Sequence, residues 1–167
     1  MAVTYDKIAS TTLASTASSV TFSSIPATYT DLVLIANPRT SNASTNDYLY
    51  VKYNSDGTYS NYSRTELYGN GSSAFSGRAS NPLIIETTGA SSTAGVFVPN
   101  MLNIQNYSNT TTYKTTLFRY SKADEVVLGG VSLWRNTAAI SQIDLIPFGG
   151  ANISIGSTFT LYGIMAA

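Results

Sequence analysis

Two residue types are missing from this 167-residue chain, which contains no histidine and no cysteine. Without histidine, no side chain has an unperturbed pKa near neutral pH, and no imidazole is available to a metal ion. Without cysteine, the chain has no thiolate nucleophile, no zinc–thiolate site and no disulfide. These absences exclude most catalytic machinery. We therefore expect a protein that works by surface contact, with no enzymatic activity and no cofactor.

Charge is also scarce, because nine basic and nine acidic side chains give a formal net charge of zero. No basic run or stripe is present, which argues against binding to a nucleic-acid backbone. No apolar stretch approaches the roughly 20 residues that span a bilayer. Residues 1–7 lack the basic and apolar regions of a signal peptide. We expect a protein made in the cytoplasm that binds neither nucleic acid nor membrane.

Short apolar runs alternate with polar residues and are interrupted by turns at roughly ten-residue intervals, a pattern typical of β-strands. The continuous apolar run of residues 32–36 predicts a strand covered on both faces. No segment sustains the apolar spacing of a helix. About eight to eleven strands predict an all-β, antiparallel β-sandwich in a single domain over residues 1–167. A jelly roll is favoured, and simpler sandwich topologies share the same pattern.

Two polar segments lack this alternation of apolar and polar residues. Residues 10–19 are small and polar, and predict a long turn or a flexible, loosely held arm after the first strand. Residues 56–81 carry four glycines among many serines, and predict a long hairpin or a loop lying over a neighbour.

Carboxylates are the only acid–base groups left for catalysis. Asp124 and Glu125 are adjacent, so their side chains point apart on an extended chain. A glycosidase needs two carboxyl groups roughly 5–10 Å apart. Any two of the remaining scattered carboxylates can meet in space, but we expect them to be solvated or ion-paired. These scattered residues are Asp47, Asp56, Glu66, Glu86 and Asp144.

Half of the twelve tyrosines lie between positions 48 and 68. One interpretation is an aromatic platform for sugars or for a protein partner, because tyrosine combines an apolar ring with a polar tip. The simpler interpretation is that tyrosine forms strands well and that Tyr48 and Tyr50 share one sheet face. A protein interface is favoured over a glycan pocket. The residues predicted to bind a partner are Tyr59, Tyr62, Arg64, Tyr68 and Arg78.

Three segments resemble a known family. They are residues 21–34 (TFSSIPATYTDLVL), residues 60–73 (SNYSRTELYGNGSS) followed by 76–78 (SGR), and residues 156–167 (GSTFTLYGIMAA). Together they are similar to small virion proteins of tailed bacteriophages, especially those of marine and cyanobacterial hosts. The resemblance implies a β-sandwich component of the particle, either a capsid decoration (cement) protein or part of a tail fibre. It carries over no catalytic motif.

The chain contains no repetitive shaft or coiled-coil segment, which favours capsid decoration over a fibre. The expected partners are then the major capsid protein and copies of the chain itself, as a dimer or trimer, on the capsid surface of the virion. Residues 10–19 and the hairpin of residues 59–78 are the expected contact regions. The alternative is a tail-fibre or spike domain that binds host glycans through the tyrosines and Trp134. A glycan depolymerase that uses two carboxylates is the least favoured hypothesis.

Overall fold

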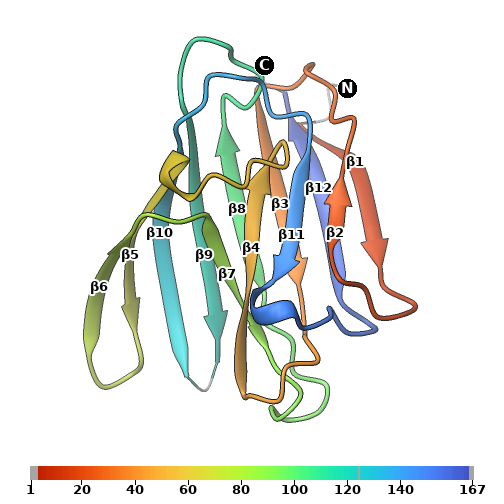
Figure 1. Cartoon of the computed structure of the whole chain (residues 1–167), viewed down its shortest axis with the longest axis vertical. Coiled ribbons are helices and arrows are strands. Elements are labelled where there is room, and N and C mark those ends of the chain that lie inside the picture. The colour runs from red at the N-terminus through yellow and green to blue at the C-terminus, as the bar shows by residue number, and fades with distance from the viewer. Residues whose placement is uncertain (1–3, 124, 166–167) are drawn as a thin grey trace.

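Twelve antiparallel strands and two short 3₁₀ helices make up the part of the chain that the computed structural model describes, residues 4–123 and 125–165 (Figure 1). The all-β prediction is confirmed, and the strands outnumber the eight to eleven expected. In chain order the elements are β1 (Tyr5–Thr12), β2 (Val20–Phe22), β3 (Asp31–Asn37), β4 (Asn46–Tyr53), η1 (Tyr59–Asn61), β5 (Tyr62–Gly69), β6 (Ala74–Ala79), β7 (Leu83–Thr88), β8 (Asn100–Gln105), β9 (Lys114–Lys122), β10 (Val126–Trp134), β11 (Ile143–Pro147), η2 (Phe148–Gly150) and β12 (Thr158–Ile164).

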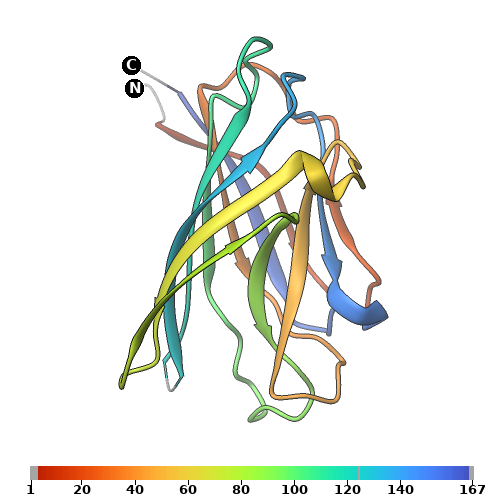
Figure 2. The ribbon, with the colours of Figure 1, turned by 60° about the vertical axis from the view of Figure 1, so that its left-hand side comes forward.

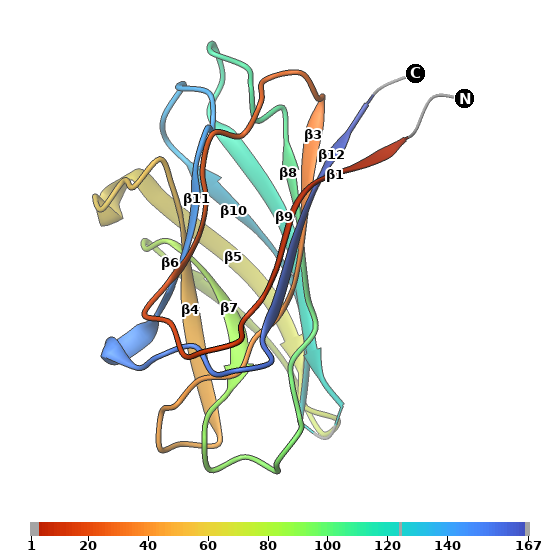
Figure 3. The ribbon, with the colours of Figure 1, turned by 90° about the vertical axis from the view of Figure 1, so that its right-hand side faces the viewer.

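The strands form two sheets that face each other, as the edge-on view in Figure 3 shows. The larger sheet has eight strands in the order β1-β12-β3-β8-β9-β10-β5-β6. The smaller sheet has four strands in the order β2-β11-β4-β7. Apolar side chains from the inner faces of both sheets form one core.

Eight of the strands pair in a nested fashion. β1 pairs with β12, β2 with β11, β3 with β8, and β4 with β7, so the first strand joins the last and each inner pair lies within the previous one. The pairs are shared between the two sheets. This is the connectivity of a jelly roll, a double-sheet fold of eight strands. The favoured topology is therefore confirmed.

Four further strands widen the larger sheet. β9 and β10 pair with each other beside β8, and β5 and β6 follow as the outermost hairpin. Figure 1 shows β10, β5 and β6 extending to the left beyond the strands of the smaller sheet. Part of the larger sheet's inner face therefore lies beyond the four strands that cover the rest of it.

β3 illustrates why the apolar run of residues 32–36 forms a central strand. Leu32, Leu34 and Ala36 face the core and are fully buried. Val33 faces the opposite side and is also buried, whereas Ile35 is half-buried there. The outward-facing side chains of β3 are therefore also largely covered, which agrees with the absence of polar alternation in its sequence.

The polar segment of residues 10–19 lies closer to the body of the protein than expected. Residues 10–12 belong to β1 and pair with β12. The Leu13 amide donates to the Ser157 carbonyl at 3.0 Å, and Ala17 forms an antiparallel bridge with Ile153. The expectation of an arm that begins at residue 10 is wrong, because backbone hydrogen bonds join the segment to residues 153–160.

The apolar residues 96–98 form no strand, and the Val96 carbonyl accepts a hydrogen bond from Thr88 Oγ1 at 2.7 Å. β10, in contrast, runs unbroken from Val126 to Trp134. The serine within it, Ser132, is buried in the middle of that strand.

The hairpin expected within residues 56–81 is formed by β5 and β6. Its turn is closed by Asn70, whose Oδ1 accepts hydrogen bonds from the amides of Ser72 and Ser73 at 3.1 and 2.9 Å. Gly71 in the same turn has a φ of 85°, a conformation that favours glycine. The Asn-Gly pair therefore turns the chain at the end of the outermost hairpin.

Two adjacent glycines on β10 should respond to alanine in opposite ways. A Cβ at Gly130 would lie 2.6 Å from Phe118 Cζ and 2.7 Å from the Thr65 carbonyl oxygen, whereas a Cβ at Gly129 would meet nothing within 4 Å. We expect Gly130→Ala to lower the free energy of unfolding by about 2 kcal/mol through overpacking. Gly129→Ala should raise it by roughly 0.5 kcal/mol, because a strand glycine loses more chain entropy. Urea unfolding of both variants measures this, and equal changes would contradict the assigned faces of β10.

Candidate binding surfaces

The five residues predicted to bind a partner lie in four different places. Tyr59 is exposed in η1. Arg64 and Tyr68 lie on the inner side of β5 and line a cleft. Arg78 on β6 pairs with Thr65 and so lies on the opposite, outer face of the sheet. The fifth residue, Tyr62, is part of the core.

Tyr62 cannot contact a partner from the surface, so its prediction as a binding residue is wrong. Its side chain is fully buried and its hydroxyl donates to the Asp56 carbonyl at 3.2 Å. Trp134, the sugar-stacking residue of the glycan alternative, is also only 1% exposed. Its indole stacks on Tyr62 with ring centres 6.4 Å apart and packs against Tyr53 at 5.6 Å. Three of the aromatic residues considered for binding thus hold the two sheets together.

The outer face of the larger sheet carries exposed apolar side chains on three neighbouring strands. Leu67 on β5 is 68% exposed and Val127 on β10 is 64% exposed. Val131 on β10 and Leu117 on β9 are direct cross-strand partners and are also exposed. Because directly paired and alternate residues share a face, these four side chains lie on the same surface, which we call the outer face.

Gly129 leaves a hollow in the middle of the outer face. It lies opposite Leu67 on β5 and opposite Arg119 on β9. A shallow hollow of about 320 Å³ is lined by Leu67, Val127 and Gly129. The absence of a side chain at Gly129 therefore gives the outer face a concave centre with apolar walls.

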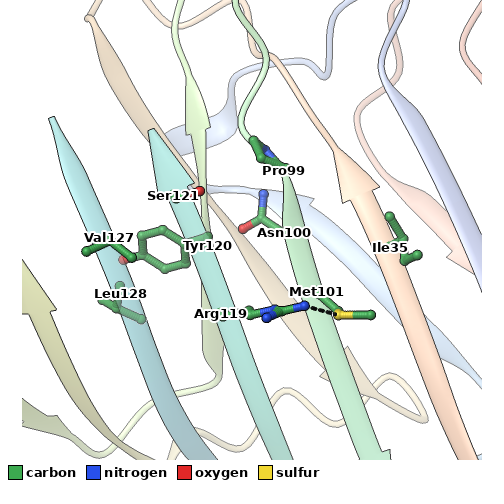
Figure 4. A pocket seen from close by; sticks show the side chains of 9 residues that line it. All are labelled: Ile35, Pro99, Asn100, Met101, Arg119, Tyr120, Ser121, Val127 and Leu128. Atoms are coloured by element: carbon green, nitrogen blue, oxygen red, sulfur yellow. Dashed lines mark hydrogen bonds between the residues drawn. The ribbon is translucent and has the colours of Figure 1, made fainter. Parts of the chain in front are cut away.

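The outer face continues across β8 toward β3 (Figure 4). Figure 4 shows the Arg119 side chain extending from β9 to β8, where Nη2 contacts Met101 Sδ at 3.2 Å. Asn100 precedes Met101 on β8 and is buried. Its Oδ1 has no hydrogen-bond partner within residues 4–123 and 125–165. These groups surround a second hollow of about 370 Å³, lined by Ile35, Pro99, Asn100, Met101, Arg119, Tyr120, Ser121, Val127 and Leu128.

A larger cleft, of about 570 Å³, lies on the inner side of the larger sheet, beside β7. β7 is the edge strand of the smaller sheet and contacts both β5 and β9. Figure 2 shows the β5–β6 hairpin diverging from β4 and β7 at this edge. The side chains that line the cleft are Asn46, Tyr48, Arg64, Glu66, Tyr68, Asn70, Ile84, Glu86, Tyr120, Glu125, Val126 and Leu128.

Two ion pairs lie in this cleft. Arg64 Nε donates to Glu66 Oε2 at 3.0 Å, and both residues project from the inner side of β5. At the other end Lys122 pairs with Glu125, and Asn46 donates to the same carboxylate. The lysine and the amide donors lower the pKa of Glu125, since both stabilise its charged form. Asp124, the neighbour considered with Glu125, lies outside the described residues.

Glu86 is the third carboxylate of the cleft, and no basic side chain of the described residues forms an ion pair with it. The residue is 4% exposed, yet its carboxylate accepts no hydrogen bond and forms no ion pair with any residue that the structure describes. Burial, and then the negative charge of Glu125, raise the pKa of Glu86 to about 7, while Lys122 opposes the shift. Glu86 therefore changes its charge near neutral pH.

Two tyrosine hydroxyl groups of the cleft lie close enough to these carboxylates for the negative charges to raise their pKa values. The pKa of Tyr120 is raised by burial and then by Glu86 and Glu66. The pKa of Tyr48 is raised by burial and then by Glu86 and Glu125. Both rings stay neutral across the physiological range, and they form the aromatic walls around Glu86.

A separate aromatic cluster lies on the outer side of the smaller sheet. Tyr50 contacts the rings of Tyr59 and Phe148, with centres 5.7 and 5.6 Å apart. Lys52 Nζ lies 5.7 Å from the centre of the Tyr59 ring, within the range of a cation–π contact. Tyr59 and Phe148 are exposed. The prediction that Tyr48 and Tyr50 share one face is confirmed, since Leu49 between them is buried.

Sequence reasoning found part of the cleft and missed the outer face. Arg64, Glu66 and Tyr68 follow a period of two, so their shared face was readable from the sequence. Glu86 comes from a distant strand and was considered only as one scattered carboxylate. The sequence alone does not distinguish Leu67 and Val127 from core residues, because an exposed apolar strand face has the same alternation as a buried one.

Comparison with protein-family models, curated proteins and solved structures returned no match for this chain. No helix within the described residues is long and apolar enough to cross a membrane. The described part of the chain also contains no group of three or more acidic side chains arranged to hold a metal ion. The outer face and the cleft are therefore the features of the structure that bear on function.

Proposed function

We propose that this protein is a structural component of a tailed-bacteriophage virion, a decoration protein that binds the outer surface of the capsid lattice and stabilises the head. The observation that carries the proposal is the outer face, where Leu67, Leu117, Val127 and Val131 are exposed side by side. The resemblance of three sequence segments to phage virion proteins supports the same conclusion.

The composition of the outer face is suited to contact with another protein. Large exposed apolar patches on soluble proteins mark interaction sites, and the core of an interface is depleted in charge. The hollow at Gly129, of about 320 Å³ and lined mainly by apolar residues, leaves room for a partner's side chain. Arg78 lies on the same face, on the outermost strand β6, and supplies a polar group at its edge. The occupant to which we commit is the major capsid protein, with copies of this chain as lateral neighbours.

Stabilisation of the head follows from linkage. A protein that binds the assembled shell but not free subunits shifts the equilibrium toward the shell by mass action. A copy that bridges neighbouring subunits gains avidity, on the order of 10² to 10⁴ over a single contact. A chain with no histidine or cysteine is sufficient for this role, because contact requires no reactive side chain.

A blocking substitution in the hollow tests the proposal. Gly129→Arg should fold, since a Cβ there meets nothing within 4 Å. It should weaken binding to undecorated phage heads about thirtyfold or more, the loss expected when a charge fills the centre of an interface. Gly57→Arg is the matched control, because Gly57 is equally unobstructed but lies in the turn before η1.

Cosedimentation with heads that lack the protein measures this binding, and the temperature of DNA release from the heads measures stabilisation. Equal binding by Gly129→Arg and the wild type would remove the outer face as the docking surface. Failure of the wild-type protein to bind heads would overturn capsid decoration itself.

The exposed aromatic cluster supports a second candidate, a tail-fibre or spike domain that binds host glycans. The exposed rings of Tyr59 and Phe148 around Tyr50 are the kind of surface on which a sugar stacks. A receptor binder should copurify with tails in few copies, whereas a decoration protein should copurify with heads in numbers close to those of the capsid subunit. Quantitative mass spectrometry of separated heads and tails distinguishes the two.

A further inference from the structure

The cleft beside β7 is not used by capsid docking through the outer face, because it opens on the inner side of the larger sheet. We propose that this cleft binds a primary alkylammonium group, such as the side chain of a partner protein's lysine or a free polyamine, with Glu86 as the anionic partner. The inference holds whether or not the protein belongs to a capsid.

The charges that line the cleft do not balance. Arg64 is paired with Glu66, and Lys122 is paired with Glu125. Glu86 has no cation within ion-pair distance among the described residues. The ionised cleft therefore carries one uncompensated negative charge, which a single cation would balance.

The residue that carries this uncompensated charge, Glu86, is buried. A buried carboxylate without hydrogen bonds is costly, and the cost falls when a donor or a cation reaches it. Glu86 lines a cleft of about 570 Å³, so its carboxyl group is approached through space that a ligand can fill. This volume lies within the range of ordinary ligand sites. The unpartnered group therefore faces a cavity rather than the packed core.

Aromatic and aliphatic side chains form the wall of the cleft around Glu86. Tyr48 and Tyr120 lie near Glu86, as the effect of its charge on both hydroxyl groups indicates. Aromatic rings attract ammonium groups through their electron-rich faces. Ile84, Val126 and Leu128 supply apolar contacts for an alkyl stem. Rings and aliphatic side chains around one carboxylate fit an ammonium group carried on a hydrocarbon chain.

A metal ion fits this arrangement less well. Calcium and magnesium require several oxygen ligands, but the oxygens of Glu66 and Glu125 are engaged by Arg64 and Lys122. A neutral sugar can satisfy the hydrogen bonds of Glu86 but leaves its charge unbalanced. Metal and sugar are therefore outcomes against which the proposal is tested.

Binding should depend on pH through Glu86. Arginine and lysine stay charged and tyrosines stay neutral near pH 7. The pKa of Glu125 is lowered, so that group stays ionised there. The charged and titratable groups that face Glu86 are Tyr48 on β4, Arg64, Glu66 and Tyr68 on β5, Tyr120 and Lys122 on β9, and Glu125 after β9.

Nuclear magnetic resonance titration of the isotope-labelled full-length chain tests the proposal. The probes are the blocked amino acid Nα-acetyl-lysine N-methylamide, the diamine putrescine, and the blocked norleucine analogue that lacks the ammonium group. We expect the lysine probe to shift the Tyr48, Ile84 and Glu86 amide signals. Its affinity should rise about tenfold between about pH 6 and about pH 8, in proportion to ionised Glu86. The norleucine probe should cause no saturable shift.

Variants separate binding from folding. Glu86→Gln keeps the shape of the side chain and should lose about tenfold in affinity at about pH 8, together with the pH dependence. Asp6→Asn, a neutralisation on β1 at the far edge of the larger sheet, should bind as the wild type does. Tyr48→Phe should retain binding and Tyr48→Leu should weaken it, if the ring face contacts the ammonium group.

The relative affinities of the lysine probe and putrescine decide between a protein side chain and a free polyamine. Equal binding of the lysine probe by wild type and Glu86→Gln at about pH 8 would overturn the proposal. So would the absence of any shift with either ammonium probe. Saturable shifts of the same amides with calcium chloride or methyl glucoside, in place of the ammonium probes, would likewise contradict an ammonium site.

Discussion

Replacing Trp134 by alanine should lower the free energy of unfolding by about 4 kcal/mol, the typical cost of removing a large buried aromatic side chain. Trp134 stacks on Tyr62 and packs against Tyr53, and its Nε1 donates to Asp56 Oδ2 at 2.8 Å. The substitution would leave a cavity where β10 meets β4 and β5. Since natural domains are stable by only roughly 5–15 kcal/mol, this single change should remove a large share of the total.

The hydrogen bond to Asp56 can be separated from the packing. Trp134→Phe keeps an aromatic ring but leaves the Asp56 carboxylate with one donor fewer, and should cost about 1–2 kcal/mol. Burial alone would raise the pKa of Asp56, but hydrogen bonds from Asn61, Trp134 and Thr58 together lower it. Trp134→Phe should therefore raise the pKa of Asp56 toward its ordinary value.

Urea unfolding followed by far-ultraviolet circular dichroism measures both variants, because the chain's single tryptophan is lost and its fluorescence cannot be used. Leu117→Ala on the exposed outer face is the control and should change stability by about 0.5 kcal/mol or less. A similar loss for Leu117→Ala and Trp134→Ala would contradict the assignment of core and surface.

The stability of the protein should fall as the pH rises from about 4.5 to about 7, by on the order of 3 kcal/mol, through Glu86 alone. In the folded chain the pKa of Glu86 is raised from 4.5 to about 7. Between these two values the unfolded chain releases a proton that the folded chain retains, so ionisation favours the unfolded state. Above the folded pKa both states are ionised, and the contribution becomes constant.

Glu86→Gln should remove this dependence. Near pH 4.5 the variant should be about as stable as the wild type, because both carry a neutral side chain. At about pH 8 it should be more stable by on the order of 3 kcal/mol. Glu125 and Asp56 act in the opposite direction, since their lowered pKa values give stability that is lost only at more acidic pH.

Denaturant unfolding across this pH range, with the wild type and Glu86→Gln in parallel, provides the measurement. Identical pH profiles for the two proteins would show that Glu86 is not buried without partners. A loss of stability for Glu86→Gln at about pH 8 would show that the ionised carboxylate is supported by a group that the geometry does not contain.

Most strands were predictable from alternation alone. The apolar run of residues 32–36 and the aromatic alternation of residues 48–53 lie in β3 and β4 as expected. β6 was recognised only as part of a hairpin, because its sequence, AFSGRA, has little apolar alternation. The order of the strands was not readable, since nested and simple pairings bury the same residues.

The division of β5 residues between cleft, core and surface depended on register. Tyr62 lies opposite Trp134 and is buried, whereas Arg64 and Tyr68 on the same side of β5 line the cleft. The difference arises because the larger sheet extends beyond the smaller one, so an inward-facing side chain is covered at one end of β5 and open at the other. A sequence pattern carries no information about where the opposite sheet ends.

A cryo-electron microscopy reconstruction of tailed-phage heads to which this chain is proposed to bind tests the capsid-decoration proposal most directly. We expect the jelly roll in many symmetry-related copies on the outside of the head, with the outer face of Leu67, Leu117, Val127 and Val131 against the capsid subunits. Density for the protein only at the tail, or heads without it, would contradict capsid decoration. Heads in which the outer face points to solvent would contradict the docking surface.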